Sequence, residues 1–166
     1  DVVHFHQQCK SVCDAHDPGF YQTFKDKCDH YFWNSHRDEA RGVGGLFFDY
    51  CRASHERSIE QWFDFVTAAG DVFLDCYTPI VNKRKDLPFG PEQRNWQELR
   101  RGRYVEFNLI HDKGTLFGLK TQGRIESILM SLPPAVQWKY NVSPAPDSEE
   151  ERLVRVLQKP INWIKQ

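Results

Sequence analysis

The sequence lacks any large excess of charge and any long apolar run, and each absence excludes a class of protein. Its 22 Lys and Arg residues almost balance its 23 Asp and Glu residues, which leaves a formal net charge of −1. Such a chain has no global field that would steer it to nucleic acid or to an acidic membrane surface. No apolar run approaches the roughly 20 residues that a membrane span needs. Any anion that the chain binds must therefore be held by local arginines.

The cysteines are odd in number and form no CxxC pair. This pattern argues against a secreted disulfide scaffold and a four-cysteine zinc site, and it suits a reducing compartment. The opening DVVHFHQQ has neither the basic start nor the apolar stretch of a signal peptide. Because this opening also lacks Met and runs directly into patterned sequence, we expect a piece of a longer polypeptide. We favour a cytoplasmic location, since no targeting segment is visible.

Helical signals occur at both ends of the chain. Residues 1–16 look helical, and a second helix is expected with Asp17 as its N-cap and Pro18 at its first position. The stretch GPEQRNWQELRRGR predicts a short helix that ends at Gly102. A last helix is expected to begin after Ser148, which can form a capping box with a glutamate three residues later.

The clearest helical pattern follows Ser58, which is spaced to form a capping box with Gln61. Apolar residues recur there every three to four positions, as on one face of a helix. The predicted apolar stripe consists of Ile59, Trp62, Phe63, Val66, Ala69 and Phe73.

The region from Arg103 to Tyr140 changes to a period of two, which is typical of strands. YVEFNLI, TLFGLKT and RIESILMSL alternate, HDKG and QG separate them, and VQWKY could add another strand. Short links between successive strands indicate an antiparallel meander. LFFDY, directly after Gly45, is a further candidate strand. We therefore expect an α+β fold, an antiparallel β-sheet flanked by α-helices, in a single domain of residues 1–166.

Several arginines lie beside predicted strands or glycine turns. A guanidinium donates two parallel hydrogen bonds and is therefore suited to gripping carboxylates. This grouping suggests a polycarboxylate ligand lying on a sheet, but the same arginines could instead pair with nearby glutamates on the surface. The arginines are Arg41, Arg100, Arg101, Arg103 and Arg124, and the glutamates are Glu39, Glu98, Glu106 and Glu126.

Histidines raise the possibility of a metal site, because imidazole is a common metal ligand. His4, His6, His30 and His36 match no zinc spacing, so hydrogen-bonded polar histidines are the alternative. Asp112 in HDKGT is also open to two interpretations. It can belong to a turn, as Asp before Gly often does, or it can accept N–H groups of a ligand.

Three stretches occur in a specific order: KDKCDHYFWNSHRDEARGVGGLFFD, RRGRYVEFNLIHDKGTLFGL and GRIESILMSLPP. Together they resemble the oxygen-dependent coproporphyrinogen III oxidase family, and the likeness runs from HFH to PINWI. The resemblance implies a coproporphyrinogen oxidase-like fold and oxidative decarboxylation of two propionates of coproporphyrinogen III to vinyl groups. The products would be protoporphyrinogen IX, carbon dioxide and hydrogen peroxide. Oxygen would be the co-substrate, with no organic cofactor.

Matched position by position, the resemblance also implies roles for individual residues. Arg41 would contact or organise the substrate site, and Asp112 would act near a pyrrole ring as the catalytic acid. Gln122, Gly123 and Arg124 would form a turn that contacts the substrate.

The resemblance further implies assembly and possible metal binding. His6 and His36 match divalent-metal ligands of some bacterial members, whereas other members are described as working without metal. Family members are typically homodimers, and the region from Tyr104 to Lys139 matches the one linked to dimerisation. Animal members lie in the mitochondrial intermembrane space, which is the alternative location.

The chain departs from the family in length and in one residue near the proposed site. Family chains are roughly twice as long, and the absent part corresponds to their N-terminal half. Lys113 stands where the family has Arg after Asp112, which keeps the charge but loses the bidentate fork. Two hypotheses follow: the C-terminal half of an active oxidase, or a non-catalytic tetrapyrrole-binding or dimerisation fragment.

Overall fold

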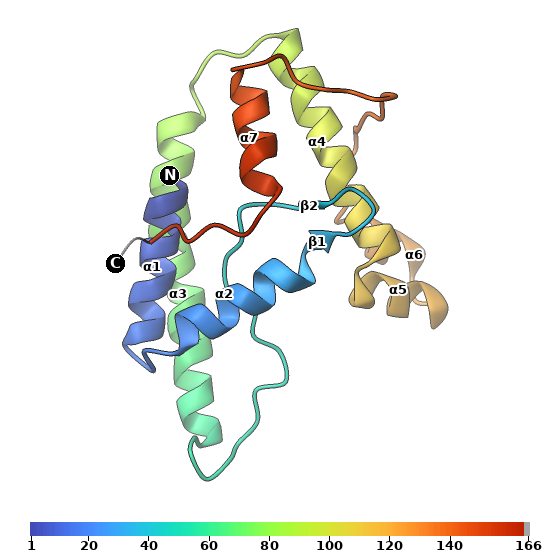
Figure 1. Cartoon of the computed structure of the whole chain (residues 1–166). Helices are drawn as coiled ribbons and strands as arrows, with labels where there is room; N and C mark the ends of the chain where they lie inside the picture. Colours follow the sequence, from blue (N-terminus) through green and yellow to red (C-terminus); the bar gives the residue numbers. More distant parts are fainter. Residues whose placement is uncertain (165–166) are drawn as a thin grey trace. The chain divides into compact units, whose positions relative to one another are not determined.

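The computed structural model describes residues 1–164 of the chain, which form helices α1–α7 and strands β1 and β2 (Figure 1). These residues divide into two compact units. Unit 1 comprises residues 1–31, 43–87 and the described residues from 161, and unit 2 comprises residues 32–42 and 88–160. Each unit is described by itself, and the expectation of a single domain stays a prediction. None of the helices in this part of the chain combines the length and the hydropathy that a membrane crossing needs.

Unit 1 consists of α1 (Val2–Asp14), α2 (Phe20–Tyr31) and α3 (Ile59–Arg84). In Figure 1, α1 runs alongside α3, in agreement with the contacts between them. The Asp17 carboxylate accepts the Gly19 N–H at 2.8 Å, so a tight turn precedes α2, which begins later than its sequence signals predicted. The capping box predicted at the start of α3 is confirmed, because Ser58 and Gln61 each accept a hydrogen bond from the backbone N–H of the other.

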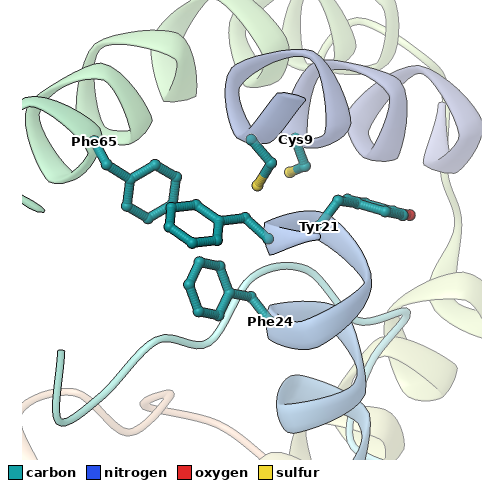
Figure 2. Close-up of a cluster of buried hydrophobic side chains, with 6 residues drawn as sticks. Cys9, Tyr21, Phe24 and Phe65 are labelled. Carbon is teal, nitrogen blue, oxygen red and sulfur yellow. The ribbon is translucent and has the colours of Figure 1, made fainter. Parts of the chain in front are cut away.

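The core of unit 1 forms where α1, α2 and α3 meet (Figure 2). The ring of Phe65 is fully buried. Its centre lies 5.0 Å from the ring centre of Phe20 and 5.5 Å from the ring centre of Phe24. Cys9 and Cys13 of α1 close the cluster. Full burial of one phenylalanine side chain contributes about 1.5–3 kcal/mol, so this aromatic contact is a main source of the unit's stability.

The predicted apolar stripe of α3 is wrong for most of its members. Trp62 and Ala69 pack against the core, but the fully buried positions are Phe65 and Cys76, which the stripe omitted. Because α3 carries apolar side chains on most of its faces, periodicity alone does not identify the face that meets α1. The exposed members of the predicted stripe are Ile59, Phe63, Val66 and Phe73.

Unit 2 contains a small antiparallel pair and four helices. β1 (Trp33–Asn34) pairs with β2 (Glu39–Ala40), with Asn34 opposite Glu39. Its helices are α4 (Pro91–Ile110), α5 (Lys113–Lys120), α6 (Ile125–Leu129) and α7 (Glu149–Leu157). The cap predicted for the last helix is confirmed, because the Ser148 hydroxyl accepts the Glu151 N–H at 3.1 Å.

The expected β-meander between Arg103 and Tyr140 is wrong. Its first predicted strand belongs to α4, its second lies largely in α5 and its third is partly α6. VQWKY and LFFDY form no strand either, so within residues 1–164 the β structure is the β1–β2 pair. Within α4 the buried residues are Leu99, Gly102 and the whole run from Val105 to Asn108, so residues of both faces of the predicted strand are buried and the alternation of YVEFNLI does not mark the buried side.

Gly102 does not end α4, contrary to the prediction. A Cβ atom at this position would lie 2.9 Å from the backbone oxygen of Gln137 and 3.3 Å from the indole nitrogen of Trp138. The missing side chain therefore lets the segment around Gln137 lie directly on the helix. The Gln137 N–H donates to the Glu98 carbonyl at 3.1 Å, which holds this segment in place.

Candidate functional site

The turn between β1 and β2 brings charged side chains to α4. The Arg37 N–H donates to the Asn34 carbonyl at 2.9 Å, and Asp38 adopts the left-handed φ of 52° that closes the turn. The buried Asn34 amide donates to the backbone oxygen of Arg103 at 3.1 Å, which ties the turn to the helix. This anchoring explains how a short strand pair can position His36 and Arg37 precisely against α4.

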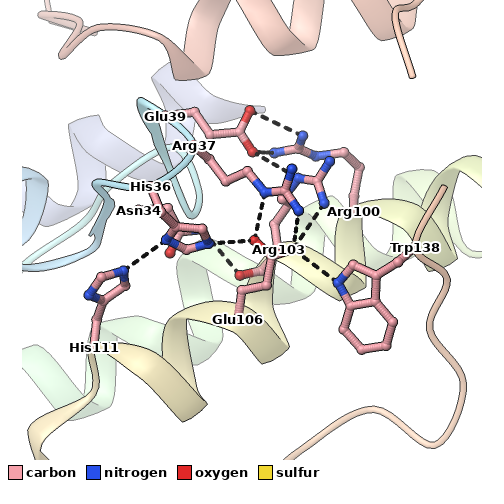
Figure 3. A network of polar contacts seen from close by, with 9 residues as sticks. All are labelled: Asn34, His36, Arg37, Glu39, Arg100, Arg103, Glu106, His111 and Trp138. Atoms are coloured by element: carbon pink, nitrogen blue, oxygen red, sulfur yellow. Dashed lines mark hydrogen bonds and ion pairs between the residues drawn. The ribbon is translucent and has the colours of Figure 1, made fainter. Parts of the chain in front are cut away.

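Most of these charged side chains contact the carboxylate of Glu106 on α4 (Figure 3). One of its oxygens accepts hydrogen bonds from Arg37 at 2.7 Å, from the Trp138 indole at 2.9 Å and from Arg103 at 3.2 Å. The other oxygen accepts from Arg37 at 2.9 Å and lies 2.8 Å from Nε2 of His36. Glu106 thus links the turn, the helix and the segment that carries Trp138.

The protonation state of Glu106 follows from these contacts. Burial raises the pKa of Glu106, but hydrogen bonds from Arg37 and His36 and the charge of Arg103 outweigh burial and lower the pKa to about 2. The hydrogen bond to Glu106 in turn raises the pKa of Arg37, whereas burial lowers the pKa of Arg103. Glu106 therefore stays ionised near neutral pH and acts as a fixed acceptor.

A second carboxylate, that of Glu39 on β2, shares one of these cations. Arg100 grips it with two hydrogen bonds of 2.9 and 3.3 Å, and Nε of Arg103 lies 3.4 Å from one of its oxygens. Arg103 therefore lies between the two carboxylates. We call the whole cluster the Glu106 network; it consists of Glu39, Glu106, His36, Arg37, Arg100, Arg103, His111 and Trp138.

The network ends in a pair of histidines. Nδ1 of His36 lies 3.0 Å from Nε2 of His111, and Nε2 of His36 lies 2.8 Å from Glu106. With Glu106 ionised, Nε2 of His36 donates to the carboxylate, and neutral imidazoles then require His111 to donate to Nδ1 of His36. The carboxylate thus sets the tautomers of both rings. No sequence pattern indicates this role of His111, because its partner His36 lies 75 residues away in the chain.

Arg41 is stacked on aromatic rings of the same unit. Its guanidinium carbon lies 4.2 Å from the ring centre of Phe32, 5.0 Å from that of Tyr104 and 5.2 Å from that of Phe107. Such stacking holds a cation in one orientation. Arg41 therefore packs against α4 through Tyr104 and Phe107, and its cation is held in place beside the network.

Asp112 occupies the turn between α4 and α5. Its carboxylate accepts the Thr115 N–H at 2.7 Å as the N-cap of α5, which agrees with the turn interpretation. Asp112 directly follows His111, which is a member of the Glu106 network. A role toward a ligand stays a prediction.

The predicted substrate-contacting turn lies between α5 and α6. Gln122 has a left-handed φ of 56°, and a Cβ on Gly123 would lie 3.1 Å from the Gly118 carbonyl. The side chains of Gln122 and Arg124 are exposed. Whether this turn contacts a substrate stays a prediction.

The two histidines matched to metal ligands lie in different units and have different surroundings. His6 is fully buried in unit 1, where Nδ1 lies 3.0 Å from the Tyr21 hydroxyl and Nε2 lies 2.9 Å from the Val43 carbonyl. Burial lowers the pKa of His6, so it is neutral at pH 7. Both nitrogens of His36 are also engaged within unit 2.

These residues do not fit a metal site in their present arrangement. Metal binding needs a ring nitrogen that is not already hydrogen-bonded, and neither His6 nor His36 offers one. Residues 1–164 also contain no group of three or more His, Cys, Asp or Glu side chains that could hold an ion.

The expected surface pairing of arginines with glutamates describes part of what is seen. Arg100 and Arg103 do pair with Glu39 and Glu106, but in an interior network rather than on an open surface. The side chains of both glutamates are only 9% exposed, so these pairs are partly desolvated. The prediction placed these ion pairs on the surface, whereas their carboxylates are buried.

Comparison with known proteins gives a consistent result. Residues 1–163 match the family described as coproporphyrinogen III oxidase. An oxygen-dependent coproporphyrinogen-III oxidase of Francisella philomiragia is 51% identical over 165 residues, which cover 99% of this chain and 52% of that protein. The protein of the same name from Francisella tularensis subsp. holarctica (strain LVS) is 50% identical, with the same coverage.

The chain spans about half the length of the curated relatives it matches. The oxygen-dependent coproporphyrinogen-III oxidase of Francisella tularensis subsp. novicida is 48% identical and is also covered over 52% of its length. The family match extends over almost every residue of this chain, including both units. The chain therefore belongs to the coproporphyrinogen III oxidase family.

Proposed function

We propose that this chain is part of an oxygen-dependent coproporphyrinogen III oxidase. The reaction would convert two propionates of coproporphyrinogen III to vinyl groups and so give protoporphyrinogen IX. The observation that carries the proposal is the family match along residues 1–163, together with relatives that bear this name. The positioned guanidinium of Arg41 supports it, because the substrate is a polycarboxylate.

The chemistry balances without an organic cofactor. Each propionate loses carbon dioxide and two hydrogens, and oxygen takes up these hydrogens to become hydrogen peroxide. The electron-rich substrate reacts with oxygen itself, so the protein has to supply position, exclusion of water and proton transfer. We propose oxygen as the co-substrate, which agrees with the name of the relatives.

The proposed roles of individual residues follow from their surroundings. Arg41 would hold a propionate, because a guanidinium that aromatic rings keep in one orientation is suited to a carboxylate. Asp112 would accept a pyrrole N–H, as an acid at a turn. The turn from Gln122 to Arg124 would hold a second propionate.

Activity of the chain itself is tested by turnover. Purified chain of 19.6 kDa, verified by intact mass, is mixed with coproporphyrinogen III in air, and protoporphyrin fluorescence is followed. If Arg41 holds substrate, turnover should fall at least ten-fold in Arg41→Gln. It should stay unchanged in the control Arg52→Gln, which replaces an exposed arginine. Equal activity of both variants would remove the role of Arg41.

The alternative function is that of a tetrapyrrole-binding or dimerisation fragment without activity of its own. Binding of coproporphyrin III without turnover of coproporphyrinogen III would support this alternative. A chain that neither binds nor turns over would contradict both functions.

We also propose a homodimer and a cytoplasmic location. The dimer would use the region from Tyr104 to Lys139, and sedimentation of the purified chain tests it: a monomer at all concentrations contradicts the proposal. The cytoplasm is favoured because the relatives are bacterial, and bacteria have no mitochondrial intermembrane space.

A further inference from the structure

Unit 2 contains a shallow cavity of about 620 Å³ beside the Glu106 network, and this cavity is widely open to solvent. Its walls come from α4, from the segment after α6 and from α7. Sites for small molecules typically have volumes of roughly 300–1,000 Å³ and mostly apolar walls with few polar groups. The volume therefore suits a small molecule or one part of a larger one.

The walls of this cavity are largely aromatic and aliphatic. Trp96 and Tyr104 of α4 face it together with Pro133 and Leu153. Tyr104 also contacts the guanidinium of Arg41 at 5.0 Å, so the cavity adjoins the residue that we assign to a propionate. Flat aromatic walls favour a flat ligand, because rings stack face to face or edge to face.

Two arginines line the same cavity, and they differ in whether their guanidinium groups already donate hydrogen bonds. Arg100 already donates to Glu39 through both terminal nitrogens. Arg101, although partly buried, makes no hydrogen bond or ion pair within residues 1–164. A partly desolvated guanidinium with five free donors is complementary to a carboxylate. The exposed surface of the cavity is itself almost entirely apolar, so the cavity suits an apolar group, and Arg101 offers the charge for a carboxylate that this group carries.

We propose that this cavity binds a flat apolar group that carries a carboxylate. The ring of the ligand lies against Trp96 and Tyr104, and its carboxylate accepts hydrogen bonds from Arg101. If the proposed function holds, on which the name of the ligand rests, that group is one pyrrole ring of the tetrapyrrole with its propionate. The site would then position the substrate next to Arg41 without reacting with it.

The test measures binding of coproporphyrin III, a stable and fluorescent tetracarboxylate, to the whole chain. Arg101→Gln should raise the dissociation constant at least ten-fold, because a charge-assisted hydrogen bond is lost. Leu153→Trp should raise it as well, because the larger side chain fills the cavity. The matched control is Arg155→Gln on α7, whose side chain is 66% exposed and pairs only with Glu151 among the described residues.

The outcomes separate this inference from the proposed function. Weaker binding in Arg101→Gln and Leu153→Trp, with unchanged thermal unfolding midpoints and an unaffected Arg155→Gln control, supports the cavity. Unchanged binding in both cavity variants overturns it, even if coproporphyrinogen III is turned over. Binding that depends on the cavity without any turnover leaves the cavity established and contradicts the proposed activity of this chain.

A smaller probe tests the chemistry of the site without reference to tetrapyrroles. Indole-3-propionate has one flat ring and one carboxylate, and its binding can be followed by chemical shift changes in the ligand. We expect these changes to disappear in Arg101→Gln and to persist in Arg155→Gln. Equal changes in both variants would contradict recognition of the carboxylate by Arg101.

Discussion

At the scale of single residues, Glu106 determines how the polar interior of unit 2 is arranged. Its carboxylate accepts hydrogen bonds from Arg37, Arg103 and Trp138 and fixes the tautomer of His36. Without its charge, the exposed Arg37 and the partly buried Arg103 would each lose the carboxylate nearest to them. The stability of the network should therefore depend on the charge of this residue and not only on its shape.

Glu106→Gln should lower the free energy of unfolding by about 3 kcal/mol, because it removes the carboxylate that Arg37 pairs with and leaves Arg103 with Glu39 alone. Urea denaturation measures the change. The matched control is Glu126→Gln on the exposed side of α6, which should change stability by less than about 0.5 kcal/mol. Equal losses in the two variants would contradict the role of the network.

At the scale of secondary-structure elements, α3 and α4 each present one face to the interior of their own unit. In α3 that face is marked by Phe65, and Phe63 lies on the exposed side. In α4 that face includes Gly102, over which the segment around Gln137 passes. Substitutions on these faces should therefore differ strongly from the same substitutions on exposed faces.

Phe65→Ala should destabilise the chain by about 3–5 kcal/mol, because a fully buried ring is replaced by a cavity. Phe63→Ala, on the same helix but 70% exposed, should cost less than about 1 kcal/mol. Thermal and urea unfolding compare the two variants. A larger effect of the Phe63 substitution would show that the other face of α3 is the buried one.

Gly102→Ala should lower stability by about 1–3 kcal/mol, because the new Cβ atom would lie 2.9 Å from the backbone oxygen of Gln137. Gly70→Ala is the control, since a Cβ there meets no atom within 4 Å. It should stabilise α3 by roughly 0.5–1 kcal/mol, as Ala does in place of Gly within helices. Opposite signs in urea denaturation are expected, and stabilisation by both substitutions would contradict the packing over Gly102.

At the scale of the whole molecule, acid should unfold the chain partly through Glu106. Its pKa is about 2 when folded, below the ordinary value of 4.5, so the folded state binds its proton less readily than the unfolded state. The stabilisation is therefore complete above about pH 4.5 and is lost as the pH falls toward 2. The contribution is about 3 kcal/mol for a shift of this size.

The pH dependence of unfolding checks this expectation. Stability is measured by urea denaturation at several pH values from neutral to acid for the wild-type chain and for Glu106→Gln. The wild-type curve should fall more steeply below about pH 4.5, and the difference between the curves should shrink as the pH approaches 2. Parallel curves would show that Glu106 has an ordinary pKa.

The capping box at Ser58, the N-cap at Ser148 and the family could be predicted from the sequence. Ser58 and Ser148 act through partners within one helical turn, so local spacing is sufficient to identify them. Family membership follows from long matching stretches and does not depend on the correct assignment of strands. This explains why the family was identified although the predicted meander was wrong.

The buried faces and the network were decided by tertiary structure. YVEFNLI alternates like a strand, yet it continues a helix in which the consecutive residues from Val105 to Asn108 are all buried. His36 and Glu106 lie 70 residues apart in the sequence, and no local pattern indicates that they are partners. The sequence by itself determined the contacts that form within a turn of the chain. The tertiary structure decided which faces are buried and which charges meet, because both depend on residues that only folding brings together.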